Sequence, residues 1–452
     1  MNMIDNSMYE KLLLFLNDKV SGLNVAEHLN ALRKTRYLSE GELKELQFKK
    51  LKKLLIHAEK HSLFYEELFS EIQFTANDFH SFEDLQRVPV LSREKLISYS
   101  DKIISKSSDP VKLKKGSSSG STGQPVIYFT DDDARSAGLA AGYLAWELAG
   151  WKLGMKGLHI WGNPDTVNQQ WNRASSKLKS RLFRHHKFPA YMLTEEGQFQ
   201  DLYIKCIKNG YRFIDGYTNA IYLFADYLKK QNLQLTGVKL VLTTGENLQD
   251  YQRELIEEMI APVFDLYGCS EINGIANECT DCGNYHTIDP HVYVEYGEPV
   301  NEEGECPLII TDLDNYAFPL IRYQNGDMAV PGKEASCKEP FGTINKISGR
   351  ESDLIHLSDG GVLSVPSFFG SSLLKKVSGI RQYQIIRDRT DHLTIKLVTD
   401  ESFTNENEKL LKESVKDYLK NSIKWDIEYV DSIPVSKTGK FKLVKDLTNE
   451  PV

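Results

Sequence analysis

A glycine-, serine- and threonine-rich segment at residues 116–125 contains the residue types that most directly indicate chemistry. It reads Gly-Ser-Ser-Ser-Gly-Ser-Thr-Gly-Gln-Pro and runs into an apolar, strand-like stretch at 126–130. Glycines let a backbone approach an anion closely, while hydroxyl and amide groups supply hydrogen-bond donors. The segment therefore predicts a phosphate-binding loop, although a flexible Gly/Ser linker would have the same composition.

This loop lacks the lysine of a Walker-type loop. Gly123 is followed by Gln124, and the next lysine along the chain is Lys152. A cation that meets the phosphates must therefore come from another segment. We expect it from Gly439–Lys440, at the end of Pro-Val-Ser-Lys-Thr-Gly-Lys; the alternative is that this lysine belongs to a solvated basic tail.

Five separated segments together resemble the acyl-adenylate-forming ligase superfamily. They are the loop, Tyr-Gly-Cys-Ser-Glu at 267–271, Ile-Arg-Tyr-Gln-Asn-Gly-Asp at 321–327, Gly349–Arg350 and Gly439–Lys440. Within the superfamily the chain is most similar to the phenylacetate–coenzyme A ligase branch and its capsular-polysaccharide-biosynthesis (CapK-like) relatives. The resemblance covers nearly the whole order of elements that the sequence predicts.

The resemblance implies an α/β fold with two domains. A large adenylation domain of layered sheets and helices would span 1–351, with a helical N-terminal layer over about 1–100, and a small, mobile α+β domain would span 352–452. The hinge would lie near Ser352 and Asp353, and Ser352 stands where the family usually has an aspartate.

The resemblance also implies site residues. Glu271 would hold Mg²⁺, Ser270 would contact the α-phosphate region, Lys440 would be the catalytic cation, and Tyr267 would stack on adenine. Asp327 would accept bonds from the ribose hydroxyls. The full set of implied ATP/AMP-binding residues is Ser117, Ser118, Ser119, Gly120, Ser121, Thr122, Gly123, Gly245, Glu246, Tyr267, Gly268, Asp327 and Arg350.

Each of these segments has a plainer interpretation when it is taken alone. Tyr267 could be a buried core residue with Glu271 a surface carboxylate, and Gly245–Glu246 could begin a helix. Asp327 could belong to an ordinary Asn-Gly turn, and Arg350 could be a surface arginine at a domain boundary.

An acyl pocket is expected around Tyr217 and Trp161, with Trp171 as further aromatic surface. Large aromatic residues in such positions are more often core than ligand contacts. No arginine or lysine is evidently placed to bind a second acidic group, which slightly favours a neutral or aromatic acid; a carboxylated sugar or an amino acid stays open.

The activity implied is that of an ATP-dependent, AMP-forming ligase. It would join a carboxylic acid to AMP and pass the acyl group to a thiol, with ATP, Mg²⁺ and coenzyme A as cofactors. One alternative is transfer to an amine or hydroxyl in surface-polysaccharide or secondary-metabolite biosynthesis. Another is a non-catalytic nucleotide-binding relative, although such a protein would have no physical need for Glu271, Asp327, Arg350 and Lys440 together.

Three of the six cysteines could share a metal site with one histidine. Cys279-x-x-Cys282-x-x-x-His286 and the later Cys337 offer the ligands of a closed, structural zinc site that pins a loop beside 267–271. The alternative is four unrelated reduced side chains.

Composition sets the remaining expectations. The 452 residues, with 41% hydrophobic and 26% charged content, predict two or three globular domains. A net charge of −8 argues against a general nucleic-acid binder. The N-terminus does not read as a secretory signal, and no apolar run is long enough to span a membrane, so a cytoplasmic protein is expected; a homodimer is left open.

Hydrophobic spacing predicts the elements that position these residues. Amphipathic helices are expected over 6–70, and Ser92 and Asp131 are expected to cap helices. Between 125 and 330, strands at 157–161, 238–243 and 263–267 alternate with helices at 134–149, 195–209, 219–231 and 248–260. The last hundred residues predict strands at 354–357, 381–387, 392–399 and 426–430 with helices at 365–377 and 406–420.

Overall fold

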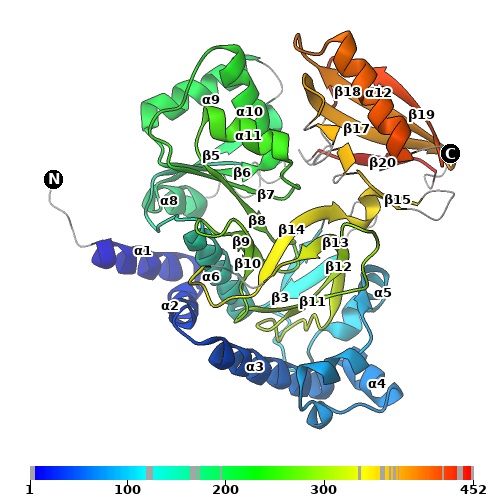
Figure 1. The fold of residues 1–452 in the computed structure, drawn as a ribbon. Helices are drawn as coiled ribbons and strands as arrows, with labels where there is room; N and C mark the ends of the chain where they lie inside the picture. Colours follow the sequence, from blue (N-terminus) through cyan, green and yellow to red (C-terminus); the bar gives the residue numbers. More distant parts are fainter. Residues whose placement is uncertain are drawn as a thin grey trace.

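The structure is a computed structural model. It describes residues 6–118, 126–162, 171, 174–193, 196–333, 337–356, 362–365, 368–369, 373–374, 376–419, 422–434 and 441–448. Two bodies are visible in Figure 1: a larger one that holds the N-terminal helices and a long sheet, and a smaller one at the C-terminal end. The α/β fold with a large N-terminal and a small C-terminal part is confirmed.

Amphipathic helices make up the first part of the chain, as the spacing predicted. They are α1 (Asn6–Ser21), α2 (Val25–Thr35), α3 (Glu40–His61), α4 (Leu63–Glu71) and α5 (Arg93–Ile103). Ser92 caps α5, because its side chain accepts a bond from the backbone N–H of Lys95. Leu51, Leu54 and Leu55 of α3 are fully buried in the main core, which anchors this layer to the rest of the large body.

One long sheet runs through the large body. Its order is β11-β12-β13-β14-β10-β9-β8-β7-β6-β4-β5, with β1 (Leu91–Ser92) beside β13. The strands are β4 (Gly157–Trp161), β5 (His185–Pro189), β6 (Phe213–Tyr217), β7 (Leu240–Thr244), β8 (Val263–Tyr267), β9 (Ala276–Glu278), β10 (Tyr285–Thr287), β11 (Val292–Tyr296), β12 (Cys306–Asp312), β13 (Tyr323–Pro331) and β14 (Thr343–Arg350). A separate hairpin pairs β2 (Lys114–Ser117) with β3 (Ile127–Thr130).

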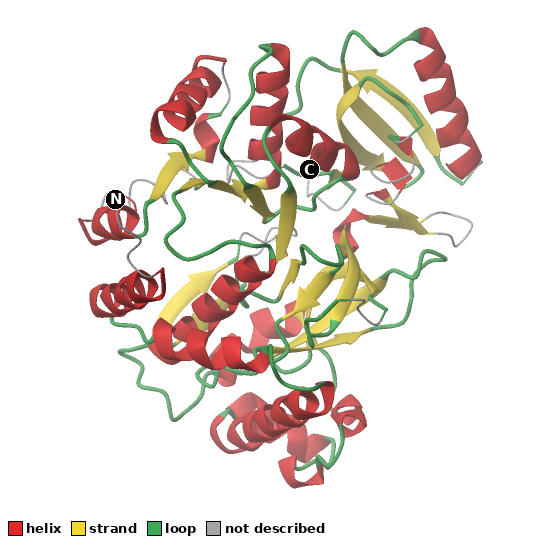
Figure 2. Ribbon diagram, turned by 60° about the vertical axis from the view of Figure 1, so that its left-hand side comes forward, coloured by secondary structure: helices red, strands yellow, loops and turns green. Residues whose placement is uncertain are grey.

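The sheet changes character at β8. Strands β5, β4, β6, β7 and β8 lie side by side in this order and pair in parallel. Beyond β8, the pairs β8–β9, β9–β10, β10–β14 and β14–β13 are antiparallel. The parallel part is joined by helices α6 (Asp132–Leu148), α8 (Ala174–Leu182), α9 (Glu196–Asn209), α10 (Thr218–Lys230) and α11 (Asp250–Met259), which Figure 2 shows packed along the strands. The predicted alternation of strands and helices is thus confirmed, with β7 beginning two residues later than expected. Because parallel strands end at the same edge, the residues after β4, β6, β7 and β8 meet there.

The small body has its own sheet and core. Its strands, in the order β19-β18-β17-β20, are β17 (Ile380–Arg389), β18 (His392–Thr399), β19 (Lys424–Tyr429) and β20 (Val444–Asp446), covered by α12 (Asn405–Leu419). A short hairpin of β15 (Leu354–His356) and β16 (Val362–Ser364) precedes them. The helix predicted at 365–377 falls partly outside the described residues. The exact boundary at 351/352 stays a prediction.

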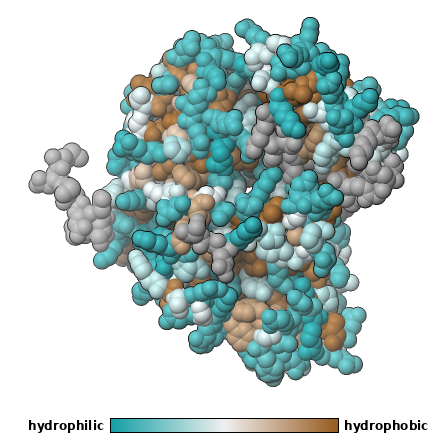
Figure 3. Space-filling view, in the orientation of Figure 1, coloured by the Kyte–Doolittle hydropathy of each residue, from teal (hydrophilic) through white to brown (hydrophobic). Residues whose placement is uncertain are grey.

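The two bodies touch through α10 and α11. The Tyr222 hydroxyl donates to the backbone oxygen of Arg381 at 2.6 Å, and the Arg381 guanidinium pairs with Asp226. The face of the molecule in Figure 3 is largely hydrophilic, with hydrophobic residues scattered over it. Among the described residues, no helix is both long and apolar enough to cross a bilayer.

Candidate functional site

Three of the predicted nucleotide-binding side chains converge although they lie on three strands. The Tyr267 hydroxyl, at the end of β8, donates to Asp327 Oδ2 at 2.9 Å. Arg350 Nε, at the end of β14, lies 3.2 Å from Asp327 Oδ1. Asn325, which sequence reasoning did not single out, donates from Nδ2 to both Asp327 and the Tyr267 hydroxyl. We call Tyr267, Asn325, Asp327 and Arg350 the nucleotide cluster.

Electrostatics keeps this cluster in one ionisation state. Burial, together with the Asp327 charge, holds the pKa of Tyr267 well above its usual value, so the phenol remains a donor. The charge of Asp327 raises the pKa of Arg350. The carboxylate is thus oriented on one side by a phenol and an amide and on the other by a guanidinium. Oδ2 already accepts two hydrogen bonds, so a further hydroxyl donor would have to approach Oδ1, the oxygen that faces Arg350.

Glu271 is buried rather than exposed at a strand end, with only 6% of its surface accessible. Its Oε1 accepts from the Tyr323 hydroxyl at 3.1 Å and lies 4.0 Å from Arg93 Nη1. Ser270 next to it is exposed. The interpretation of Glu271 as a surface carboxylate is therefore wrong, and a buried carboxylate beside an exposed hydroxyl suits a cation-binding role.

Arg93 is a residue that sequence reasoning missed. Its Nη2 donates to Ser118 Oγ at 3.3 Å while its Nη1 faces Glu271, so one guanidinium links the start of the serine-rich loop to the expected Mg²⁺ ligand. The only signal in the sequence is its place directly after the N-cap Ser92, which puts it in the first turn of α5. Nothing in that position distinguishes it from an ordinary surface arginine.

The serine-rich loop leaves and rejoins a hairpin. Ser117 ends β2, and the Ser118 N–H donates to the backbone oxygen of Val126 at 2.9 Å, so the loop's two ends are side by side. A Cβ at Gly116 would meet the Tyr128 ring at 2.2 Å, so a larger residue there would have to displace that ring. The expected phosphate contacts Ser119, Gly120, Ser121, Thr122 and Gly123 lie outside the described residues.

The Gly245–Glu246 segment contacts the C-terminal body near Phe441. Gly245 has φ +82°, a conformation that favours glycine. Glu246 Oε2 accepts from the Asn219 N–H at 2.8 Å, and its Oε1 accepts from the Phe441 N–H at 2.6 Å. Lys440 itself lies outside the described residues, but its immediate neighbour is bonded to the segment expected on the adenine side.

The connection between the bodies carries a partly buried carboxylate, that of Asp353. Asp353 Oδ2 accepts from the Arg350 N–H at 3.0 Å, and burial raises the pKa of Asp353 to about 6. This aspartate is one residue beyond Ser352, the position at which the family resemblance leads one to expect it. The hinge remains a prediction.

Tyr217 and Trp161, the two residues expected at the acyl pocket, lie together at the ends of the neighbouring strands β6 and β4. Their rings stack with centroids 4.0 Å apart and planes inclined by 27°. Burial raises the pKa of Tyr217 to about 12, so its hydroxyl stays protonated. The pair presents flat aromatic surface at the edge where the parallel strands end.

A polar cluster beneath this pair was not anticipated. Asp215 Oδ1 lies 2.6 Å from His185 Nε2, and its Oδ2 contacts His159 Nδ1. His159 in turn stacks against Trp161, with 5.4 Å between ring centroids. Burial opposes the charge on Asp215, but the two imidazoles outweigh it and hold the pKa well below its usual value. The alternation of His159 with Trp161 and of Asp215 with Tyr217 along two strands was the available signal.

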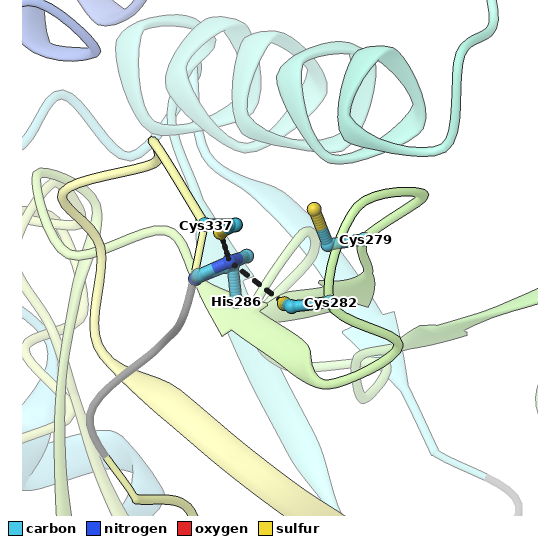
Figure 4. A group of neighbouring side chains, drawn as sticks. All are labelled: Cys279, Cys282, His286 and Cys337. Carbon is cyan, nitrogen blue, oxygen red and sulfur yellow. Dashed lines mark hydrogen bonds between the residues drawn. The ribbon is translucent and has the colours of Figure 1, made fainter.

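Cys279, Cys282, His286 and Cys337, which we call the cysteine cluster, converge as the sequence predicted. Figure 4 shows the four side chains facing one another, with His286 between Cys282 and Cys337. His286 Nε2 is 3.0 Å from Cys337 Sγ and 3.5 Å from Cys282 Sγ. One ligand atom from each residue lies within 4.8 Å of the others.

Comparison with known proteins gives the same class. Residues 359–446 match the model of the CapK C-terminal domain family. The chain is 24% identical over 414 residues to the protein CapK of Staphylococcus aureus, covering 88% of each chain. It is 26% identical over 397 residues to the phenylacetate–coenzyme A ligase of Thermus thermophilus, covering 82% of this chain and 84% of that one.

Solved structures agree in fold. The 2-hydroxyisobutyryl-CoA ligase in its postadenylation state, in complex with an acyl-AMP, superposes with a TM-score of 0.74 at 18% identity over 92% of both chains. The same protein in its thioesterification state superposes less well, with a TM-score of 0.59 over 92% of this chain and 91% of that one. The chain therefore shares the fold of this ligase, as the mixed α/β architecture with a large and a small body indicated.

The chain is thus similar to CapK and to the phenylacetate–coenzyme A ligases along most of its length, and the match to the CapK C-terminal domain model lies in its small body.

Proposed function

We propose that the protein is an AMP-forming ligase that activates a carboxylic acid with ATP. The observation that carries this proposal is the bond from the Phe441 N–H to Glu246 Oε1. It joins the segment that contains Lys440 to the end of β7, between the predicted acyl residues on β4 and β6 and the nucleotide cluster. This contact supports the proposal that groups of both bodies act at one edge of the sheet, as a reaction between an acid and a nucleotide requires.

The residues divide the first step between them. The substrate carboxylate attacks the α-phosphorus of ATP, the acyl–phosphate bond forms, and pyrophosphate leaves with the electron pair of the broken bond. Lys440 would place an ammonium near the charge that develops in the transition state. Asp327 and Arg350 would hold the ribose, and Arg93 with the Ser118 hydroxyl would lie along the phosphates. Glu271 would hold Mg²⁺, which offsets the triphosphate charge when bound.

In a second step the acyl group would pass from AMP to a thiol, for which coenzyme A is the expected acceptor. The thiolate would attack the acyl carbon, a thioester bond would form and AMP would leave. The curated relatives named as coenzyme A ligases support this acceptor. Movement of the small body about the segment near Asp353 would take the Lys440 segment away and open the acyl carbon to the thiol.

The stacked rings of Trp161 and Tyr217 favour an acid with a flat, apolar body. His159 and His185 add hydrogen-bonding groups below that surface, so a polar substituent at the far end of the acid is also compatible with the site. A polar end agrees with the carboxylated sugar or amino acid that the sequence left open beside a neutral or aromatic acid.

The test is carboxylate-dependent exchange of labelled pyrophosphate into ATP, with a panel of aromatic, aliphatic, amino and sugar acids. We expect exchange with at least one aromatic or neutral acid and none without acid. Absence of exchange with every acid, in protein that still binds ATP, would favour a non-catalytic nucleotide-binding relative. For an active acid, product analysis with coenzyme A, amines and hydroxyl compounds then identifies the acceptor.

A further inference from the structure

The cysteine cluster is assembled from two segments that are far apart in sequence. Cys279 and Cys282 flank the turn between β9 and β10, His286 lies in β10, and Cys337 comes from the segment that leads to β14. Cys279 is 3% exposed and His286 is fully buried. One ligand atom of each residue nevertheless lies within 4.8 Å of the others, and Figure 4 shows the four side chains grouped around His286.

The turn between the two cysteines is shaped around the sulfur atoms. The Asp281 N–H donates to Cys279 Sγ at 3.4 Å, and the Gly283 N–H closes the turn on the Cys279 backbone oxygen at 3.0 Å. Gly283 has φ +70°, so the residue after the second cysteine needs the left-handed conformation that glycine adopts most readily. Backbone N–H groups that point at sulfur stabilise a thiolate over a thiol.

A backbone carbonyl group orients the imidazole ring of His286. His286 Nδ1 lies 3.1 Å from the backbone oxygen of Phe341, which can only accept a bond, so Nδ1 carries the proton. Nε2 then faces the sulfur atoms of Cys282 and Cys337, where its lone pair could bind a cation shared with them. A metal-binding histidine typically donates its other ring N–H to a carbonyl or carboxylate in this way.

We propose that Cys279, Cys282, His286 and Cys337 bind one Zn²⁺ ion in a closed, structural site. Three soft sulfur ligands and one imidazole nitrogen suit zinc and do not suit Mg²⁺ or Ca²⁺, which prefer oxygen. Four protein ligands fill a tetrahedral shell and leave no position for substrate, so the ion takes no part in the ligase reaction. The proposal therefore does not depend on the proposed function.

The ion would tie the β9–β10 hairpin to the segment that enters β14. His286 pairs with Thr343 of β14, while β9 pairs with β8 so that Ala276 lies opposite Tyr267. Without the ion, only the short strands β9 and β10, of three residues each, would connect Tyr267 on β8 with β14 in the sheet. Zinc thus stabilises the middle of the long sheet where its parallel and antiparallel parts meet.

The experiment measures zinc by mass spectrometry in the full-length protein, purified without chelator, and compares two cysteine variants. We expect about one zinc per chain in the wild type and in Cys206→Ser, whose cysteine is buried in α9 far from the cluster, and at least about a fivefold loss in Cys337→Ser. Less than about 0.2 zinc per chain in the wild type, or equal loss in both variants, would overturn the proposal.

Cobalt substitution keeps the proposal testable if Cys337→Ser does not fold. Wild-type protein stripped of zinc and loaded with Co²⁺ should show intense thiolate-to-cobalt charge-transfer absorption and the visible bands of a tetrahedral ion. A spectrum with weak octahedral bands only would contradict a three-sulfur site. Removal of the metal is also expected to lower the thermal midpoint, and re-addition of Zn²⁺ to restore it.

Discussion

The nucleotide cluster and the cysteine cluster lie on neighbouring strands of one sheet but are stabilised in opposite ways. In the nucleotide cluster, groups of opposite character face one another: the Asp327 carboxylate meets Arg350, a phenol and an amide. In the cysteine cluster, four metal-ligating atoms of the same character converge within 4.8 Å. The first arrangement is complete with protein atoms alone, whereas the second is most stable when a cation lies between its ligands.

Lys440→Ala should give the largest effect and should separate the two clusters. We expect adenylate formation, measured as pyrophosphate exchange, to fall by at least about a hundredfold because a charge next to the transition state is lost. Zinc content should not change. Lys424→Ala, at a lysine of the small body whose side chain is 79% exposed, is the control for an altered domain charge. Unchanged exchange in Lys440→Ala would contradict the proposed catalytic role.

Asp215→Asn tests how the cluster of His159, Asp215 and His185 is stabilised. The alternatives are contacts between protein groups, as in the nucleotide cluster, and a bound cation, as proposed for the cysteine cluster. Asp215 is the shared partner of two imidazoles and is only 3% exposed. We expect the substitution to lower the free energy of unfolding in urea by about 2 kcal/mol, because a buried charge-assisted pair is lost. Addition of a chelator should not change that difference.

A second test of the same cluster compares the two histidines of β5, the strand beyond β4. His186→Asn replaces an imidazole that bonds to Tyr211 on the opposite face of β5, so it should leave the acid preference in the exchange assay unchanged. His185→Asn should shift that preference. A chelator-dependent stability of the wild type that Asp215→Asn abolishes would mean that this cluster holds a metal as well.

Glu246→Ala should have a smaller effect on activity. It removes the acceptor for the N–H groups of Asn219 and Phe441, so the Lys440 segment is held less firmly in position. We expect kcat/KM for adenylate formation to fall about tenfold, which corresponds to about 1.4 kcal/mol. Glu246→Gln, which keeps a carbonyl acceptor, should recover part of the activity. Equal activity of the alanine variant and the wild type would show that this contact does not position the lysine.

The sequence was sufficient to predict the features that depend on local spacing of residue types along the chain. Helices and strands followed from hydrophobic spacing, and the convergence of Cys279, Cys282, His286 and Cys337 followed from ligand chemistry. Arg93, Asn325 and the His159–Asp215–His185 cluster could not be predicted with the same ease. Each of them acquires its role from a strand that becomes its neighbour only in the fold, and its local sequence is that of an ordinary helix start, turn or strand.

Asp265→Asn should have the smallest effect, on the pH dependence of stability. Asp265 lies on β8 between the two clusters and accepts bonds from Thr243 and from Tyr285, the residue before His286. Burial and the nearby charge of Glu278 raise its pKa to about 7. A raised pKa means that the residue's stabilising contribution is complete below the unfolded value of 3.8 and is lost as the pH rises through about 7.

The wild type should therefore lose more stability than Asp265→Asn when urea unfolding is measured at pH 5 and again at pH 8. We expect a difference of at least about 1 kcal/mol between the two pH changes. Glu258→Gln, at an exposed carboxylate of α11, is the control for net charge and should follow the wild type. Parallel curves for Asp265→Asn and the wild type would mean that Asp265 is ionised throughout this range. In that case Asp265 would act as an ionised carboxylate on β8, as Asp327 does in the nucleotide cluster, and not as a protonated acid.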